Sequence, residues 1–196
     1  CRGGSPLTEA LLVSIGIVAL AEIGDKTQLL TLVLAARYKK PWPIVAGIFV
    51  ATLVNHGIAG AVGAWLTRTI GPDAMRWILG VSFIAMAAWM LVPDKLDDDD
   101  AAARKVGGVF VTTTVLFFFV EIGDKTQIAT VALAARFDSL VAVVMGTTVG
   151  MILANAPVAF FGEALARRLP VRAVHVVAAV VFAALDEQGK YTADPT

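Results

Sequence analysis

The same seven residues, Glu-Ile-Gly-Asp-Lys-Thr-Gln, occur twice in this chain, at positions 22–28 and again at 121–127. Each copy lies inside a long apolar run, where ionisable side chains are costly and are functional by default. Together the copies supply four carboxylates and two amides, which are all oxygen ligands. Oxygen ligands suit Mn²⁺, Ca²⁺ or Mg²⁺ and match Zn²⁺ or Cu⁺ poorly. The repeated motif therefore predicts a binding site for a divalent cation.

On a regular helix, successive residues are about 100° apart, so the motif would form an oxygen-bearing strip. Glu22, Asp25 and Gln28 would share one side of that helix. Lys26 would lie on the other flank of Glu22, and Thr27 would point nearly opposite. We expect the acids to face the protein interior, because a carboxylate in lipid costs several kcal/mol even on lenient scales.

The second copy can complete the site if it lies across a pseudo-two-fold axis from the first. Four carboxylates, the two lysines and one divalent cation then sum to zero charge. Without the metal, the carboxylates repel one another in a low dielectric and bind protons more readily. Metal and protons would compete for the same oxygens, which is the physical basis of antiport. The residues expected to bind metal and couple protons are Glu22, Asp25, Glu121 and Asp124, with Lys26 and Lys125 as charge partners.

A structural alternative is that each glutamate forms an ion pair with a neighbouring lysine and only holds the bundle together. We favour the functional interpretation, because two lysines leave an excess of acids that such pairs do not neutralise. Gly24 is expected to loosen the helix at the motif and to free a backbone carbonyl.

Several polar residues are candidate auxiliary ligands or outer support for the metal. Asn55 and Asn155 occupy matching positions in two apolar runs. An asparagine there either hydrogen-bonds a neighbouring helix as a structural contact or contributes to the metal site. We favour the second role because the positions match. The hydroxyls of Thr27 and Thr126 are expected to bond to the backbone of their own helices, as hydroxyls in helices commonly do, although each could instead donate to the site. The auxiliary set comprises Gln28, Gln127, Asn55, Asn155, Thr27 and Thr126.

Other residues have more ordinary interpretations. His56 is a candidate proton relay, but the second copy has Ala156 at that place, so we do not favour this role. Pro157 is expected to kink its helix. The aspartates at 97–100 are interpreted as a solvated linker. Glycines that predict close helix packing are Gly47, Gly57, Gly60, Gly63, Gly146, Gly150 and Gly162.

The elements that must position these residues are membrane helices. Hydrophobic residues make up 58% of the 196 residues and charged ones 16%, whereas a soluble domain is roughly a quarter charged. The apolar runs reach about 20 residues, which is the length needed to span a bilayer. A net charge of zero argues against nucleic acid as a partner. Because Cys1 is the only cysteine, intrachain disulfides and thiolate metal clusters are excluded.

The apolar runs predict an all-α membrane protein with six transmembrane helices. The expected spans are 7–37, 44–66, 77–92, 106–136, 140–165 and 174–185, the last being short. Matches at an offset of 99 residues, and of 100 for the asparagines, make residues 1–93 and 106–185 two three-helix repeats. The segment 94–105 is an acidic linker, and 186–196 is a polar tail. An odd number of spans per repeat inverts the second one, as in many secondary transporters.

Cations in the loops predict the orientation of the chain in its membrane. Nine cations lie on one side and five on the other, so we place the nine-cation side in the cytoplasm and both termini outside it. Four tryptophans near span ends are expected to act as interfacial anchors, namely Trp42, Trp65, Trp77 and Trp89.

The doubled Glu-hydrophobic-Gly-Asp-(Lys/Arg)-(Thr/Ser) motif resembles that of the Gdt-type cation/proton exchangers, uncharacterised protein family 0016. The resemblance spans about residues 7–185. It implies export of Mn²⁺ or Ca²⁺ from the cytoplasm in exchange for protons, with the ion as substrate and without a permanently bound cofactor. Bacterial members resemble manganese exporters, which favours Mn²⁺ and the bacterial inner membrane. By position, the family's metal-binding acids fall on Glu22, Asp25, Glu121 and Asp124.

Two other functions are weighed against exchange. A cation channel also uses acidic rings, but a ring needs several copies around an axis, and the symmetry here is internal and two-fold. An intramembrane Mg²⁺-dependent enzyme acting on a lipid phosphate would need more basic residues near the metal than Lys26 and Lys125.

Overall fold

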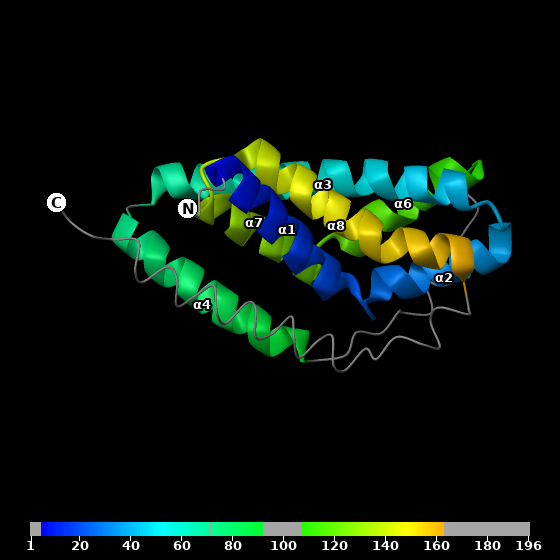
Figure 1. Ribbon diagram of the computed structural model, residues 1–196, viewed down its shortest axis with the longest axis horizontal. Helices are drawn as coiled ribbons and strands as arrows, with labels where there is room; N and C mark the ends of the chain where they lie inside the picture. Colours follow the sequence, from blue (N-terminus) through cyan, green and yellow to red (C-terminus); the bar gives the residue numbers. More distant parts are fainter. Residues whose placement is uncertain (1–4, 71, 92–106, 163–196) are drawn as a thin grey trace.

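The computed structural model describes residues 5–70, 72–91 and 107–162, and all regular secondary structure in these residues is helical. The prediction of an all-α protein is confirmed. Most of the helices form an elongated bundle, and α4 diverges along one edge of it (Figure 1). The helices are α1 (Pro6–Glu22), α2 (Lys26–Tyr38), α3 (Pro41–Thr69), α4 (Pro72–Met90), α6 (Val109–Glu121), α7 (Lys125–Arg136) and α8 (Leu140–Phe161).

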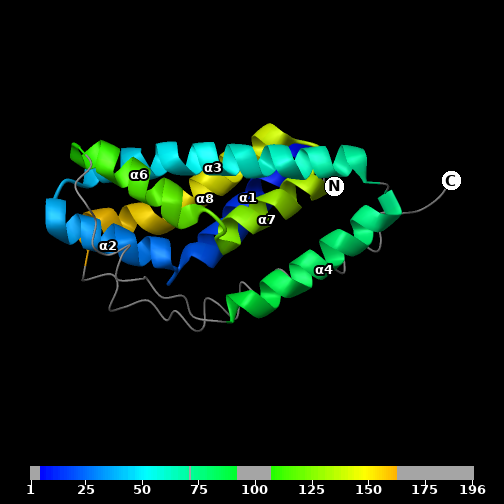
Figure 2. The ribbon, with the colours of Figure 1, turned by 180° about the vertical axis from the view of Figure 1, so that it is seen from behind.

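Each motif breaks its helix. Helix α1 ends at Glu22, α2 begins at Lys26, and the two helices are bent by 69° relative to each other. Gly24 has a φ of 82° and Gly123 a φ of 76°, which is the left-handed region that glycine adopts without steric cost. The expected continuous strip across the motif is therefore wrong, whereas the expected loosening at Gly24 is confirmed. Both breaks lie near the middle of the bundle (Figure 2).

The two halves of the chain pack across each other. Helix α1 lies along α8, and α3 lies along α6 (Figures 1 and 2). A Cβ on Gly146 would lie 2.7 Å from the Cβ of Ser14, and a Cβ on Gly47 would lie 2.8 Å from that of Thr113. Ser14 and Thr113 are themselves 99 residues apart. The same glycine contact thus occurs once at each crossing, as a structural duplication requires.

Glycine packing is confirmed at five of the seven predicted positions. Gly60 and Gly63 pack α3 against α7 and α8, and Gly150 packs α8 against the backbone of α1. The prediction is wrong for Gly57 and Gly162, where an added Cβ would meet no atom within 4 Å. Gly162 instead ends α8 with a φ of 51°.

Within the described residues, α3 and α8 are each long and apolar enough to cross a membrane, and α1 with α2 makes a third span if the bent pair counts as one. Helix α8 continues past Pro157 to its end. The chain is therefore an integral membrane protein. The expected sixth span at 174–185, the linker at 94–105 and the tail at 186–196 lie outside the described residues.

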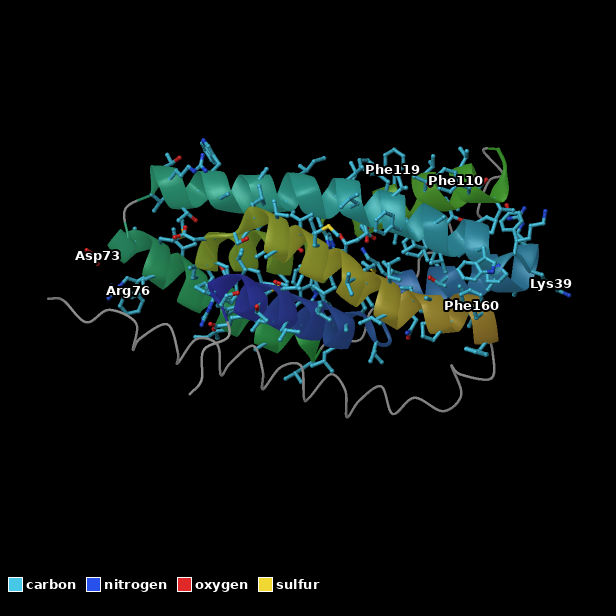
Figure 3. The ribbon with its side chains drawn as sticks, turned by 45° about the horizontal axis from the view of Figure 1, so that its top comes forward. Lys39, Asp73, Arg76, Phe110, Phe119 and Phe160 are labelled. Atoms are coloured by element: carbon cyan, nitrogen blue, oxygen red, sulfur yellow. The ribbon has the colours of Figure 1, made fainter. Side chains whose placement is uncertain are left out.

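The surface of the bundle fits a bilayer. Trp42, Trp65 and Trp77 are 73%, 61% and 78% exposed and lie within a few residues of helix ends, as interfacial anchors do. Lys39 lies at one end of the bundle, while Asp73 and Arg76 lie at the other (Figure 3).

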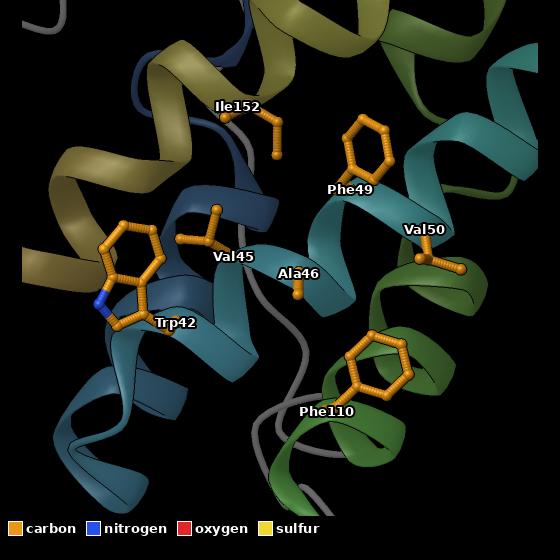
Figure 4. Close-up of a pocket in the computed structure, with 7 residues that line it drawn as sticks. All are labelled: Trp42, Val45, Ala46, Phe49, Val50, Phe110 and Ile152. Carbon is orange, nitrogen blue, oxygen red and sulfur yellow. The ribbon is translucent and has the colours of Figure 1, made fainter.

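An apolar groove of about 310 Å³ lies on the flank of the bundle between α3, α6 and α8 (Figure 4). Among the described residues no titratable side chain lines it, so the groove offers no charged ligand for a cation. Its lining residues are Trp42, Val45, Ala46, Phe49, Val50, Phe110 and Ile152.

Candidate metal centre

The helix breaks bury all four acids of the two motifs. Glu22 and Glu121 end α1 and α6 and are 0% exposed, while Asp25 and Asp124 precede α2 and α7 and are 2% exposed. Each aspartate is the N-cap of the helix that follows it, a position that aspartate favours. The breaks therefore place both carboxylates of each motif in the interior without a continuous helix between them.

Three of the four acids lie together. Glu22, Asp25 and Asp124 each offer a carboxylate oxygen, and these oxygens lie within 4.8 Å of one another. Oxygen ligands bind Ca²⁺ or Mg²⁺ at about 2.0–2.6 Å, so two ligands of one ion are at most about 5 Å apart. One divalent cation can therefore contact all three carboxylates, which come from both halves of the chain.

One oxygen of Glu22 is available for such an ion. Its Oε2 atom accepts hydrogen bonds from the hydroxyl of Thr27 and from Nδ2 of Asn155, the latter at 3.3 Å. Its Oε1 atom is buried and has no hydrogen-bond partner among the described residues. A buried carboxylate oxygen without a donor is costly, and a cation would remove that cost.

Glu121 is held differently from Glu22. Its Oε1 atom accepts from the Thr52 hydroxyl at 2.7 Å, and its Oε2 atom accepts from Nδ2 of Asn55 at 2.9 Å. Asn55 also donates to the carbonyl of Phe118 at 3.0 Å. Both oxygens of Glu121 are thus already hydrogen-bonded, and Glu121 is not among the three clustered acids.

The asparagines support the glutamates from the opposite half of the chain. Asn155 on α8 contacts Glu22 at the end of α1, and Asn55 on α3 contacts Glu121 at the end of α6. These contacts follow the helix pairs that the glycines bring together. The sequence predicted that both asparagines support the metal site. The structure shows in addition which glutamate each one contacts.

The two lysines have different environments. Lys26 lies 3.3 Å from Oδ1 of Asp124 in the other motif, and not on the flank of Glu22 as the helical projection placed it. The helix break explains this difference, because Lys26 begins a new helix with a different direction. Lys125 is 2% exposed, and its Nζ lies 6.0 Å from the centre of the Trp89 ring.

The threonines of the motifs bond to acids. Thr27 donates to Glu22 across the break, so the prediction that it points away is wrong. Thr126 donates to Oδ2 of Asp124 at 3.2 Å. Their hydroxyls therefore bond to motif carboxylates, and not to the backbone of their own helices as we expected.

The glutamines bond to the backbone of the breaks. The side-chain oxygen of Gln28 accepts from the amide of Gly24 at 2.9 Å, and that of Gln127 accepts from the amide of Gly123 at 2.7 Å. These bonds satisfy amides that a helix break leaves open.

Three residues at the site were not predicted from the sequence. Thr52 contacts Glu121, while Thr31 and Met151 contact Asn155. A threonine one helical turn before an intramembrane asparagine is a signal that could have identified Thr52. His56 is fully buried, but neither ring nitrogen has a hydrogen-bond partner in the described parts of the chain.

Comparisons with known proteins identify the family of this chain. A family model described as "Divalent cation/proton antiporter GDT1" matches residues 10–98 and 109–186, two segments that suggest an internal repeat. A Vibrio cholerae serotype O1 protein named "Putative manganese exporter" is 50% identical over 173 residues, which cover 88% of this chain and 86% of the relative. No solved structure matches the chain. Because the family model covers most of the sequence, the resemblance carried by the two motifs is confirmed, and the chain belongs to the GDT1 family of divalent cation/proton antiporters, which are transporters and not enzymes.

Proposed function

We propose that this chain exports Mn²⁺ from the cytoplasm in exchange for protons, and that Glu22, Asp25 and Asp124 bind the ion together. The observation that carries the proposal is the cluster of three buried carboxylate oxygens within 4.8 Å of one another. The choice of Mn²⁺ over Ca²⁺ is supported by the name of the Vibrio cholerae relative, which is half identical to this chain.

Charge balance supports exchange at this cluster. The four carboxylates and the two lysine ammoniums of the motifs carry two net negative charges, which one divalent cation neutralises. Two protons neutralise the same group equally well. The empty cluster would carry uncompensated charge in a low dielectric, which is unfavourable. The loaded and the protonated states are therefore the forms suited to crossing, so metal in one direction is coupled to protons in the other.

Glu121 takes a different part in this proposal. Its two oxygens accept hydrogen bonds from Thr52 and Asn55, and it lies outside the cluster of three acids. A protonated Glu121 keeps one oxygen free to accept while its hydroxyl donates. We therefore assign metal binding to the clustered acids and proton coupling to Glu121 as well as to the cluster.

The proposed architecture is six spans in two inverted three-helix repeats, residues 1–93 and 106–185, joined by the linker 94–105. The doubled helix break and the matching α1–α8 and α3–α6 contacts support it. Broken helices that meet near the membrane centre are how many secondary transporters form an ion site. The loop cations support an orientation with both termini outside the cytoplasm, and the bacterial relative supports a location in the inner membrane of a bacterium.

Proteoliposomes that enclose a pH-sensitive dye test the proposal. Added Mn²⁺ should enter and drive protons out, and an opposing pH gradient should slow the uptake. Glu22→Gln should abolish exchange, whereas Glu9→Gln, on the exposed part of the same helix, should not. Mn²⁺ entry that is indifferent to the pH gradient, or exchange that survives Glu22→Gln, would contradict the proposal.

A further inference from the structure

The side-chain amide of Asn155 has more acceptors than hydrogens. Its Nδ2 lies 3.3 Å from Oε2 of Glu22, 3.2 Å from the carbonyl of Met151 and 3.1 Å from Sδ of Met151. An amide nitrogen carries two hydrogens, and a thioether is the weakest of these three acceptors. The sulfur of Met151 is therefore the acceptor most easily given up. The same Asn155 amide also donates to Glu22, whose Oε1 atom has no hydrogen-bond partner among the described residues.

The surroundings of the two asparagines differ at this sulfur. Thr52 lies one helical turn before Asn55, and Met151 lies one helical turn before Asn155. Thr52 donates a hydrogen bond to Glu121, whereas Met151 places a buried thioether beside the partner of Glu22. The asparagine that contacts Glu22 thus has a thioether one helical turn before it, where the asparagine that contacts Glu121 has a hydroxyl.

We infer that Met151 is a specificity-determining residue, whose thioether makes the site prefer Mn²⁺ to Ca²⁺ and Mg²⁺. This inference rests on the proposed function of the carboxylate cluster. Three carboxylates alone suit all three ions, because all are hard oxygen binders. Mn²⁺ also takes carboxylate, carbonyl and water ligands, but it is the transition metal among the three ions, so replacing one oxygen by a thioether costs it less than it costs Ca²⁺ or Mg²⁺. One sulfur ligand therefore supplies the discrimination that the acids lack.

Asn155 can release the sulfur by turning its amide over, which keeps a hydrogen bond to Thr31 and gives up those to Glu22 and to the carbonyl of Met151. Its Oδ1 accepts from the Thr31 hydroxyl at 2.7 Å, and that hydroxyl also lies 2.9 Å from the carbonyl of Thr27. If the amide turns over, Nδ2 donates to Thr31, and the Thr31 hydrogen goes to Thr27. Oδ1 then faces Glu22 as a further oxygen ligand, and the sulfur of Met151 is free to contact the ion.

Met151→Leu tests the inference, because leucine keeps the size and apolar character of the residue and removes the sulfur. The matched control is Met145→Leu on the same helix, where the side chain is 42% exposed on the outer surface. The purified full-length protein is titrated separately with Mn²⁺, Ca²⁺ and Mg²⁺ while its thermal unfolding is followed. Binding to the native state alone raises the unfolding temperature with ligand concentration.

We expect Met151→Leu to weaken Mn²⁺ binding about tenfold, corresponding to about 1.4 kcal/mol, and to leave Ca²⁺ and Mg²⁺ binding unchanged. X-ray absorption of bound Mn²⁺ should show sulfur in the first shell of the wild type and of Met145→Leu, but not of Met151→Leu. Unchanged selectivity, or an equal loss for all three ions, overturns the inference. If the wild type exchanges Mn²⁺ for protons while Met151→Leu keeps its selectivity, only this inference fails. If the wild type binds no Mn²⁺, the proposed function fails as well.

Discussion

Lys26 of the first motif and Asp124 of the second form an ion pair of 3.3 Å that joins the two halves of the chain at the metal cluster. The lysine side chain is 24% exposed, so water can solvate its ammonium in part. The aspartate side chain is only 3% exposed, so its carboxylate relies on the ammonium to compensate its charge. The pair places a fixed positive charge next to the oxygens that would bind the ion. That charge limits how many positive charges the cluster can take up.

Lys26→Met should therefore slow exchange and retain metal. Without the ammonium, the cluster keeps a net negative charge after binding one divalent cation, so the loaded form becomes unsuited to crossing. Mn²⁺ should bind at least as tightly, exchange should fall about tenfold or more, and the free energy of unfolding without metal should drop by about 2 kcal/mol. Binding by thermal shift and exchange in liposomes measure the two effects.

Lys39→Met is the control for this change, because Lys39 is an exposed cation at the end of the bundle. It should behave like the wild type in both assays. Equal loss of metal binding and exchange in Lys26→Met would contradict the assigned role, since it would mean that the lysine only maintains the fold.

Gly123→Ala should damage the helix break without creating a steric clash. Gly123 has a φ of 76°, and an added Cβ would meet no atom within 4 Å, so the cost is the backbone conformation itself. That cost is roughly 1–2 kcal/mol of unfolding free energy, and exchange should fall because Lys125 and Asp124 shift. Gly16→Ala is the matched control inside α1, where it also meets open space and should stabilise by about 0.5–1 kcal/mol. Equal effects of the two substitutions on unfolding would contradict this reading of Gly123.

The sequence predicted the acids, the asparagines and Gly24 because each is a costly or unusual residue in an apolar run. It did not predict the partners of Lys26 and Thr27, since a helical projection assumes a continuous helix and the breaks redirect both side chains. A role for Met151 at the site could not be predicted, because the sequence does not distinguish a methionine at a site from one that only packs in the hydrophobic core. Its sulfur is found beside Asn155 only in the structure. The repeat and the glycines predicted close helix packing, but not that α1 packs on α8 and α3 on α6, because that depends on tertiary placement.

Binding of Mn²⁺ should weaken on acidification. A carboxylate must lose its proton before it can bind a metal, so metal affinity falls as protons occupy the same oxygens. Thermal stabilisation by a fixed Mn²⁺ concentration should be larger at pH 8 than at pH 6, and the difference should shrink in Asp25→Asn, which removes one shared carboxylate. Stabilisation that is the same at both pH values would show that metal and protons do not share these oxygens.

Glu121→Gln should separate metal binding from proton coupling. Glu121 lies outside the cluster of three acids, and glutamine preserves an oxygen that can accept from Thr52 or Asn55. The variant should therefore bind Mn²⁺ within about twofold of the wild type, a change of less than 0.5 kcal/mol, and should lose most of its proton-coupled exchange. Glu22→Gln should lose both properties, because Glu22 belongs to the cluster. Equal loss of Mn²⁺ binding in the two variants would mean that Glu121 joins the ion in a state other than this one, and the division of roles would be wrong.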